Sequence, residues 1–148
     1  MPYINASGEL KTKPTQHSVK ELRSLGISPD VLICRSDQEL PSDEKNKIAL
    51  FCSVPNDSVI SMHDVETVYS VPLLLHSQKV DKTILKKLKI NTKQAQLNDW
   101  KRVVKAKLLP EKEVTVSFVG KYTELKDSYK SINEALEHAG IKNKTRVN

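Results

Sequence analysis

The chain has 148 residues, of which 38% are hydrophobic and 28% charged, and its formal net charge is +6. This length suits one ordinary domain, which buries roughly 68–70% of the surface of its unfolded chain. No apolar run approaches the ~20 residues that span a bilayer, and residues 1–4 lead into polar sequence without the pattern of a secretory signal. We therefore expect a cytoplasmic protein without a membrane partner.

The charge and the cysteines restrict the possible ligands further. A net positive charge attracts anions of many kinds, but the chain has no RNA-reading aromatic motif, zinc-finger spacing or helix-turn-helix pattern. Nucleic acid is therefore not the favoured partner. Cys34 and Cys52 lie in apolar segments without CxxC spacing or a nearby pair of histidines. We expect reduced core cysteines and no metal site.

Residues 11–16, Lys-Thr-Lys-Pro-Thr-Gln, form the first informative segment. They stand between a Gly-containing loop and a helix whose apolar face carries Val19, Leu22 and Leu25 and which Gly26 ends. Lysines supply mobile charges, a helix start supplies unpaired N–H groups and a positive dipole end, and proline fixes one φ angle. This combination suits a polyphosphate, although for so short a motif a solvated basic surface is the alternative.

Residues 27–78 alternate between strand and helix patterns. The apolar run 31–34 predicts a strand covered on both faces, and residues 58–61 predict a second short strand. Between them, residues 41–44 start a helix whose buried side carries Ile48, Phe51 and Cys52. Asp64 is a possible cap of the next helix. The alternation predicts an α/β fold with a parallel sheet.

The remainder of the chain divides into two segments. Residues 79–111 are rich in lysine and contain a helix with Leu97, Trp100, Val104 and Leu108 on one face. Residues 112–148 read as a strand over 114–119, a helix that Gly140 ends, and the start of a second strand after Lys144. Since a βαβ unit cut within its last strand leaves an unpaired sheet edge, we expect a truncated domain.

Several of these segments, in the same order, closely resemble the CTP synthase family: residues 2–22, 30–36, 47–52 and 119–122. The resemblance implies that the chain is an internal piece of such an enzyme. Residues 1–78 would be the last part of its amidoligase (synthetase) domain, a P-loop-like, three-layer α/β domain with a parallel sheet. Residues 79–111 would be the interdomain linker, and residues 112–148 the first βα unit of a class I glutamine amidotransferase domain.

The resemblance also implies an activity for the parent protein. CTP synthases convert UTP, ATP and glutamine into CTP, ADP, phosphate and glutamate in pyrimidine nucleotide biosynthesis. ATP phosphorylates O4 of the uracil ring, and ammonia from glutamine then displaces that phosphate. The implied cofactors are ATP and Mg²⁺, the implied activator is GTP, and the implied assembly is a homotetramer.

Three sets of residues match binding positions of the family. The set implied to bind UTP and the feedback inhibitor CTP is Lys11, Thr12, Lys13, Pro14, Thr15, Gln16 and Lys47. The set implied to bind ATP is Arg35, His63, Asp64 and Val65. The set implied to lie near the GTP site and the interdomain contact is Lys121, Tyr122 and Lys130.

Structural alternatives remain open for several of these residues. Lys47 is otherwise a surface lysine, Arg35 a partner in an ion pair, and Asp64 a helix cap. Tyr122 packs in the alternative reading, while Lys121 and Lys130 face water.

The sequence provides no catalytic centre. A glutaminase needs a nucleophilic cysteine, yet no cysteine follows residue 52, and the family's magnesium carboxylates precede this segment. We therefore predict no catalytic residue and no metal ligand here, and no activity for the chain alone. The alternatives are an inactive gene fragment and a small nucleotide- or nucleic-acid-binding module.

Overall fold

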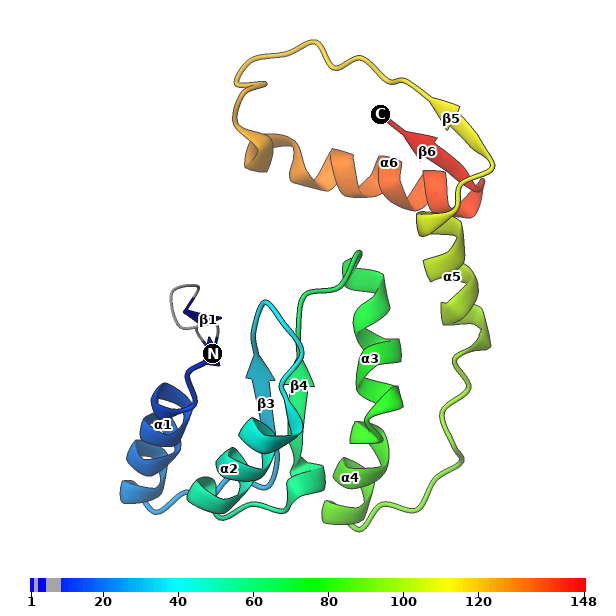
Figure 1. Ribbon diagram of the computed structural model, residues 1–148. Coiled ribbons are helices and arrows are strands. Elements are labelled where there is room, and N and C mark those ends of the chain that lie inside the picture. Colours follow the sequence, from blue (N-terminus) through cyan, green and yellow to red (C-terminus); the bar gives the residue numbers. More distant parts are fainter. Residues whose placement is uncertain (2, 5–8) are drawn as a thin grey trace. The chain divides into compact units, whose positions relative to one another are not determined.

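The computed structural model describes residues 1, 3–4 and 9–148. It divides into two compact units, Met1–Ala95 and Gln96–Asn148, whose elements appear in Figure 1. The division falls inside residues 79–111, for which the sequence predicts a linker. The Gly-containing loop predicted before residue 11 lies outside the described residues.

The described residues of unit 1 form two small sheets and the helices around them. The antiparallel pair is β1 (Tyr3–Ile4) and β2 (Glu9–Leu10), and the parallel pair is β3 (Leu32–Arg35) and β4 (Val59–Met62). The α-helices are α1 (Lys13–Ser24), α2 (Ser42–Cys52), α3 (Val71–Ser77) and α4 (Val80–Lys87), and the short 3₁₀ helices are η1 (Asn56–Ser58) and η2 (Val68–Ser70). The predicted α/β class with parallel strands is confirmed.

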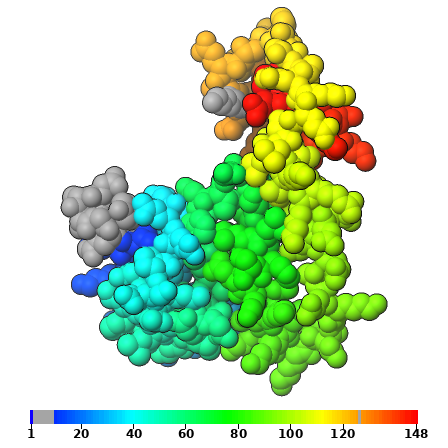
Figure 2. All heavy atoms as spheres, turned by 45° about the vertical axis from the view of Figure 1, so that its right-hand side comes forward, coloured from blue at the N-terminus to red at the C-terminus, as the bar shows by residue number. Residues whose placement is uncertain are grey.

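The core of unit 1 lies between α1, α2 and one face of the parallel pair. Its buried residues are Leu10, Val19, Cys34, Leu40, Ile48, Ala49, Cys52, Val54 and Val59. In the space-filling view, the cyan residues around α2 adjoin the green residues of α3 and α4 (Figure 2). The side of the sheet that Cys34 faces is thus covered by α1 and α2, and Ile60 on the other side of β4 is fully buried as well.

The opposite face of β3 is open. Ile33 alternates with Cys34 along the strand, and 53% of its surface is exposed. The prediction that this strand is covered on both faces is therefore wrong. The physical reason is that successive side chains point to opposite faces of a strand, and the described elements bury Ile60 of β4 on this second face but leave its β3 neighbour Ile33 exposed.

Gln78 completes the backbone hydrogen bonds at one side of β4. Its side-chain Oε1 accepts from the Ser61 amide at 2.9 Å, and its Nε2 donates to the Ser61 carbonyl at 2.8 Å. The side-chain amide of Gln78 thus makes the two hydrogen bonds that a residue of a neighbouring strand would make with Ser61, because it offers a donor and an acceptor. This contact fixes the segment after α3 beside β4.

Two details of the predicted helices differ in unit 1. Phe51 is 61% exposed, whereas Ala49 joins Ile48 and Cys52 in the core, so the predicted buried position of Phe51 is wrong. Asp64 caps no helix, because residues 63–65 have no regular structure and the next helical turn begins at Val68. The Thr67 side chain occupies the cap position instead.

Unit 2 is built around one βαβ crossover. After α5 (Asn98–Leu108), the strands β5 (Lys112–Val114) and β6 (Thr145–Val147) pair in parallel, joined by η3 (Lys126–Tyr129) and α6 (Lys130–Lys142). The helix predicted within residues 79–111 and the predicted strand–helix–strand order are confirmed. The first strand is shorter than the predicted 114–119, because β6 and Asn148 offer backbone partners only as far as Val116.

Gly140 lies inside α6 rather than at its end, which corrects the sequence prediction. A Cβ atom at this position would lie 2.5 Å from the Thr145 carbonyl oxygen and 3.1 Å from Cγ2 of Val147. Glycine therefore allows the helix to approach β6 closely. The helix ends at Lys142 instead, and Lys144 turns the chain with a φ of 51°.

The two cysteines are buried and free, as predicted. Burial raises the pKa of both the Cys34 and the Cys52 thiol above the usual 9.0. The unfolded chain therefore loses these protons at a lower pH than the folded chain. It follows that the stability of the folded state is fully present below the usual thiol pKa and declines as the pH rises above it.

We expect the urea midpoint of unit 1 to fall between about pH 8 and about pH 10, measured by far-UV circular dichroism. A Cys34→Ala/Cys52→Ala variant is the control, because it keeps the lysines and tyrosines that also titrate in this range. The variant should show a shallower decline with pH. Equal slopes for the two proteins would contradict the assigned cause.

Candidate functional site

The segment 11–16 forms the entry to α1, as the sequence predicts. Thr12 occupies the cap position and is 3% exposed. Gln16 donates to Thr12 twice, from its backbone N–H to the carbonyl at 3.1 Å and from Nε2 to Oγ1 at 3.1 Å. Thr12 thus fixes the start of the helix, and the exposed side chains of Lys13 and Pro14 lie on its first turn.

A groove of about 510 Å³ runs beside α1. It is lined by Lys13, Gln16, His17, Val19, Lys20, Arg23 and Phe51. Six of these residues come from α1, and Phe51 comes from α2, which packs against α1. The groove thus combines one end of the predicted phosphate-binding motif with an aromatic ring.

The groove is strongly cationic. Lys13, Lys20 and Arg23 carry positive charges, and none of the lining residues is acidic. Glu21 lies beside the groove residue His17, with its Oε1 3.9 Å from Nδ1 of the imidazole. The helix N-terminus near Lys13 adds a partial positive charge and N–H groups without intrahelical partners. The arrangement can bind a polyanion that also carries a flat ring.

Phe51, for which the sequence predicts a buried position, lines this groove instead. The buried positions of α2 are 48, 49 and 52. Successive residues of an α-helix are rotated by about 100° around its axis, so the side chain of residue 51 points about 110° away from the mean direction of these three. The pattern Ile48-Ala49-x-x-Cys52 was visible in the sequence and could have placed Phe51 on the flank of the helix.

Lys47 lies one helical turn before Phe51 on the same face of α2, since residues four apart are neighbours on a helix surface. Its Nζ atom is 3.6 Å from Oε2 of Glu44, and its side chain is half exposed. The structure therefore places Lys47 on the Phe51 face of the helix, although Lys47 does not line the groove.

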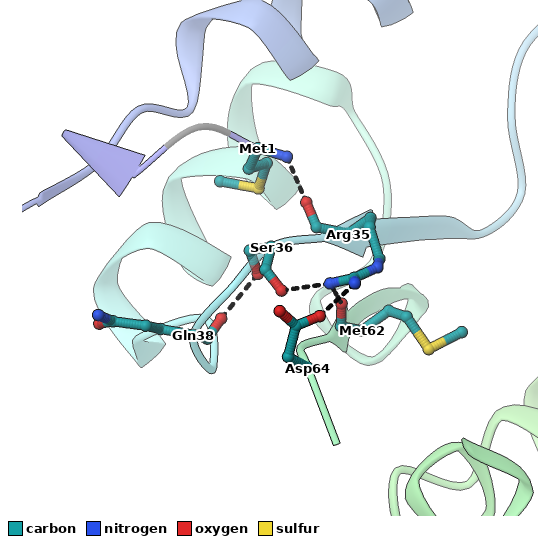
Figure 3. A network of polar contacts seen from close by, with 6 residues as sticks. All are labelled: Met1, Arg35, Ser36, Gln38, Met62 and Asp64. Atoms are coloured by element: carbon teal, nitrogen blue, oxygen red, sulfur yellow. Dashed lines mark hydrogen bonds and ion pairs between the residues drawn. The ribbon is translucent and has the colours of Figure 1, made fainter. Parts of the chain in front are cut away.

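A second cluster lies where β3 and β4 end (Figure 3). The Arg35 guanidinium donates from Nη1 to the Ser36 carbonyl at 2.6 Å and to the Met62 carbonyl at 3.4 Å, and it pairs with the Asp64 carboxylate through Nη2. The amino group of Met1 donates to the Arg35 carbonyl. The ion-pair alternative for Arg35 is thus observed. The pair lies at the carboxyl ends of the parallel strands, where α/β proteins bind ligands.

His63 and Val65 flank Asp64 and are both partly buried. Within the described part of the chain, Nδ1 of His63 is buried and has no hydrogen-bond partner. The four residues predicted to bind ATP therefore form one neighbourhood, three of them consecutive and the fourth joined by the ion pair. None of them lines the groove beside α1.

The third predicted set lies in unit 2. Lys121, Tyr122 and Lys130 are all exposed, and Tyr122 has a φ of 60° with 72% of its surface exposed. The alternative in which Tyr122 packs is therefore wrong. It is Tyr129 that packs here, with its ring centroid 4.8 Å from that of Phe118 and its hydroxyl donating to the Lys121 carbonyl.

A divalent metal ion needs several carboxylate, imidazole or thiolate ligands gathered at one point. Across residues 1, 3–4 and 9–148, no group of three His, Cys, Asp or Glu side chains could hold a metal ion. The residues present thus do not fit a Mg²⁺ site of their own. Among the described helices, none combines the length and the apolar character needed to cross a bilayer.

These features define a class of α/β protein with two clusters of polar side chains. A basic groove that contains an aromatic ring lies at a helix start, and an Arg–Asp pair lies at the carboxyl ends of the parallel strands. Comparison with protein families agrees with this class: the family described as CTP synthase N-terminus matches residues 1–90. The chain therefore belongs to the CTP synthase N-terminus family. That family contains ligase-type enzymes of pyrimidine nucleotide biosynthesis, whose substrates are nucleotides.

Proposed function

We propose that this chain supplies nucleotide-positioning residues of a CTP synthase, which converts UTP, ATP and glutamine into CTP, ADP, phosphate and glutamate. The observation that carries the proposal is the groove beside α1, because it joins the end of the Lys-Thr-Lys-Pro-Thr-Gln motif to cationic and aromatic side chains. A nucleoside triphosphate has the complementary parts, a polyphosphate and a planar ring.

In this proposal, Lys13 and the first turn of α1 bind the triphosphate of UTP or CTP. Lys11, Thr15 and Lys47 add polar groups around it, and Phe51 lies against the pyrimidine ring. Thr12 and Pro14 act by holding the start of the helix. The supporting facts are the hydrogen bonds between Gln16 and Thr12 and the shared helix face of Lys47 and Phe51.

We propose further that Arg35, His63, Asp64 and Val65 border the adenine of ATP. The Arg35 side chain is 61% exposed, so one planar face of its guanidinium can stack on a base while the edge keeps its hydrogen bonds. The ATP phosphates and Mg²⁺ need other ligands, because the described residues form no metal site. Lys121, Tyr122 and Lys130 would serve GTP activation in the glutaminase part, and the working assembly would be a homotetramer.

Isothermal titration of the 148-residue chain with UTP and with CTP tests the groove. Lys13→Ala should weaken binding about tenfold or more, because it removes a charge-assisted contact to phosphate. Phe51→Ala should weaken binding of UTP but spare binding of inorganic triphosphate, which has no ring.

The matched control is Leu50→Ala, since Leu50 is adjacent on α2 and 75% exposed but does not line the groove. Equal losses for Phe51→Ala and Leu50→Ala would overturn the role of the ring. Unchanged affinity in Lys13→Ala would overturn the triphosphate site. Preference for RNA over UTP and CTP would favour a nucleic-acid-binding module instead.

A further inference from the structure

The net charge of this chain is concentrated in one short segment. Residues 79–93 contain six lysines and one acidic residue, Asp81, which gives +5 and leaves only +1 for the rest of the chain. The segment comprises Lys79, helix α4 and the residues that follow it, all within unit 1. We call residues 79–93 the basic segment.

Internal ion pairs do not account for this charge. Lys87 pairs with Asp30 at 3.0 Å, and Asp81 contacts Nδ1 of His76 at 3.2 Å. In the part of the chain that the structure describes, the other five lysines have no carboxylate partner: Lys79, Lys82, Lys86, Lys89 and Lys93. Lys82 and Lys86 are i,i+4 neighbours on α4, a spacing at which like charges repel.

The helix dipole explains only part of the pattern. Lysines in the last turn of α4 are favourable, but Lys79 stands at the opposite, positive end. Lys79 and Lys89 also flank the helix with φ angles of 60° and 55°, a conformation that glycine or asparagine adopts at lower cost. The basic segment thus retains both the repulsion between neighbouring lysines and the strained backbone at Lys79 and Lys89. We take this as an indication that its charge serves to bind another molecule.

Apolar side chains share this surface. Ile84 is 40% exposed, Leu88 is 63% exposed and Ile90 is 51% exposed. In contrast, the segment contains no aromatic residue and no arginine. These are the side chains that stack on bases or grip phosphates bidentately, so the surface lacks the usual features of a nucleic-acid site.

We propose that the basic segment binds an acidic polypeptide segment of a partner protein in which apolar residues alternate with carboxylates. The lysines pair with its carboxylates, and Ile84, Leu88 and Ile90 receive its apolar side chains. A bilayer surface fits less well, because α4 has eight residues and uses Val80, 4% exposed, to pack on unit 1. Interfacial helices instead bury a continuous apolar face in the lipid.

Fluorescence anisotropy with the 148-residue chain tests this surface. The probes are a labelled peptide that intersperses Glu with Leu and Ile, the same peptide with Gln in place of Glu, and labelled polyuridylate. Lys82→Glu/Lys86→Glu should lower affinity for the acidic peptide about tenfold or more. Leu88→Ser, which leaves the charge unchanged, should lower it by a smaller factor.

The control is Lys101→Glu/Lys105→Glu, which reverses two exposed lysines at the same i,i+4 spacing on α5. It should bind the acidic peptide nearly as well as the unmodified chain. Equal loss in the control, equal binding of the Gln peptide, tighter binding of polyuridylate, or no binding of the acidic peptide would each overturn the proposal. Circular dichroism confirms that each variant remains folded.

Discussion

Ile48→Ala is expected to lower the free energy of unfolding of unit 1 by about 2–5 kcal/mol. Ile48 lies in the middle of α2, is fully buried, and belongs to the cluster that joins this helix to α1 and β3. The substitution removes apolar contacts and leaves a cavity that neighbouring side chains fill only partly. Because the exposed Phe51 does not help to anchor α2, the core depends on few large side chains.

Urea denaturation followed by far-UV circular dichroism measures this effect, and hydrogen exchange of unit 1 amides assigns it to the correct part of the chain. Leu50→Ala on the same helix is the control, since Leu50 is 75% exposed, and surface changes usually stay within about 0.5 kcal/mol. A loss below about 1 kcal/mol for Ile48→Ala would contradict the packing described for α2.

Gly140→Val is expected to destabilise unit 2 by about 3 kcal/mol. The new Cβ would lie 2.5 Å from a backbone oxygen, that of Thr145. A backbone atom cannot turn away as a flexible side chain can, and the turn at Asn143 and Lys144 joins α6 directly to β6. The helix and the strand must therefore separate, with loss of the contacts between them.

Ala139→Val is the matched control, because Ala139 is the neighbouring residue on α6 and is exposed. It introduces the same β-branched side chain and should cost only the difference in helix propensity, about 0.5 kcal/mol. Thermal unfolding followed by Trp100 fluorescence reports on unit 2, which contains the single tryptophan. Similar costs for the two variants would show that Gly140 is not needed for the approach of α6 to β6.

Local patterns predicted much of this fold. The start of α1 at the Lys-Thr-Lys-Pro-Thr-Gln motif, the helix after residue 41 and the strand–helix–strand order of unit 2 follow from caps, proline and apolar spacing within a few residues. Membership of the CTP synthase family was also readable from motif order, and the family match over residues 1–90 confirms it. The nucleotide-binding roles of these residues stay predictions.

The errors share one cause. For Phe51, apolar character predicted burial, but the orientation of α2 against α1 left its ring at the edge of the groove. The sequence predicts Asp64 as a possible local cap, whereas this residue pairs with Arg35, 29 residues away in the chain. The sequence predicts a helix end at Gly140, whereas this residue allows the close contact with β6. Each correct answer depends on a neighbour from another element.

From the residues alone, the order of the motifs thus indicates the family. Short-range preferences predict the order of the elements and place the Lys-Thr-Lys-Pro-Thr-Gln segment at a helix start. The groove around Phe51, the Arg35–Asp64 pair and the close approach at Gly140 arise only when distant segments meet. Periodicity tells which side of an element is apolar, but not which neighbour, or whether water, lies against each side. Which neighbour contacts each side is decided by tertiary packing, because packing brings together residues that are far apart in the sequence.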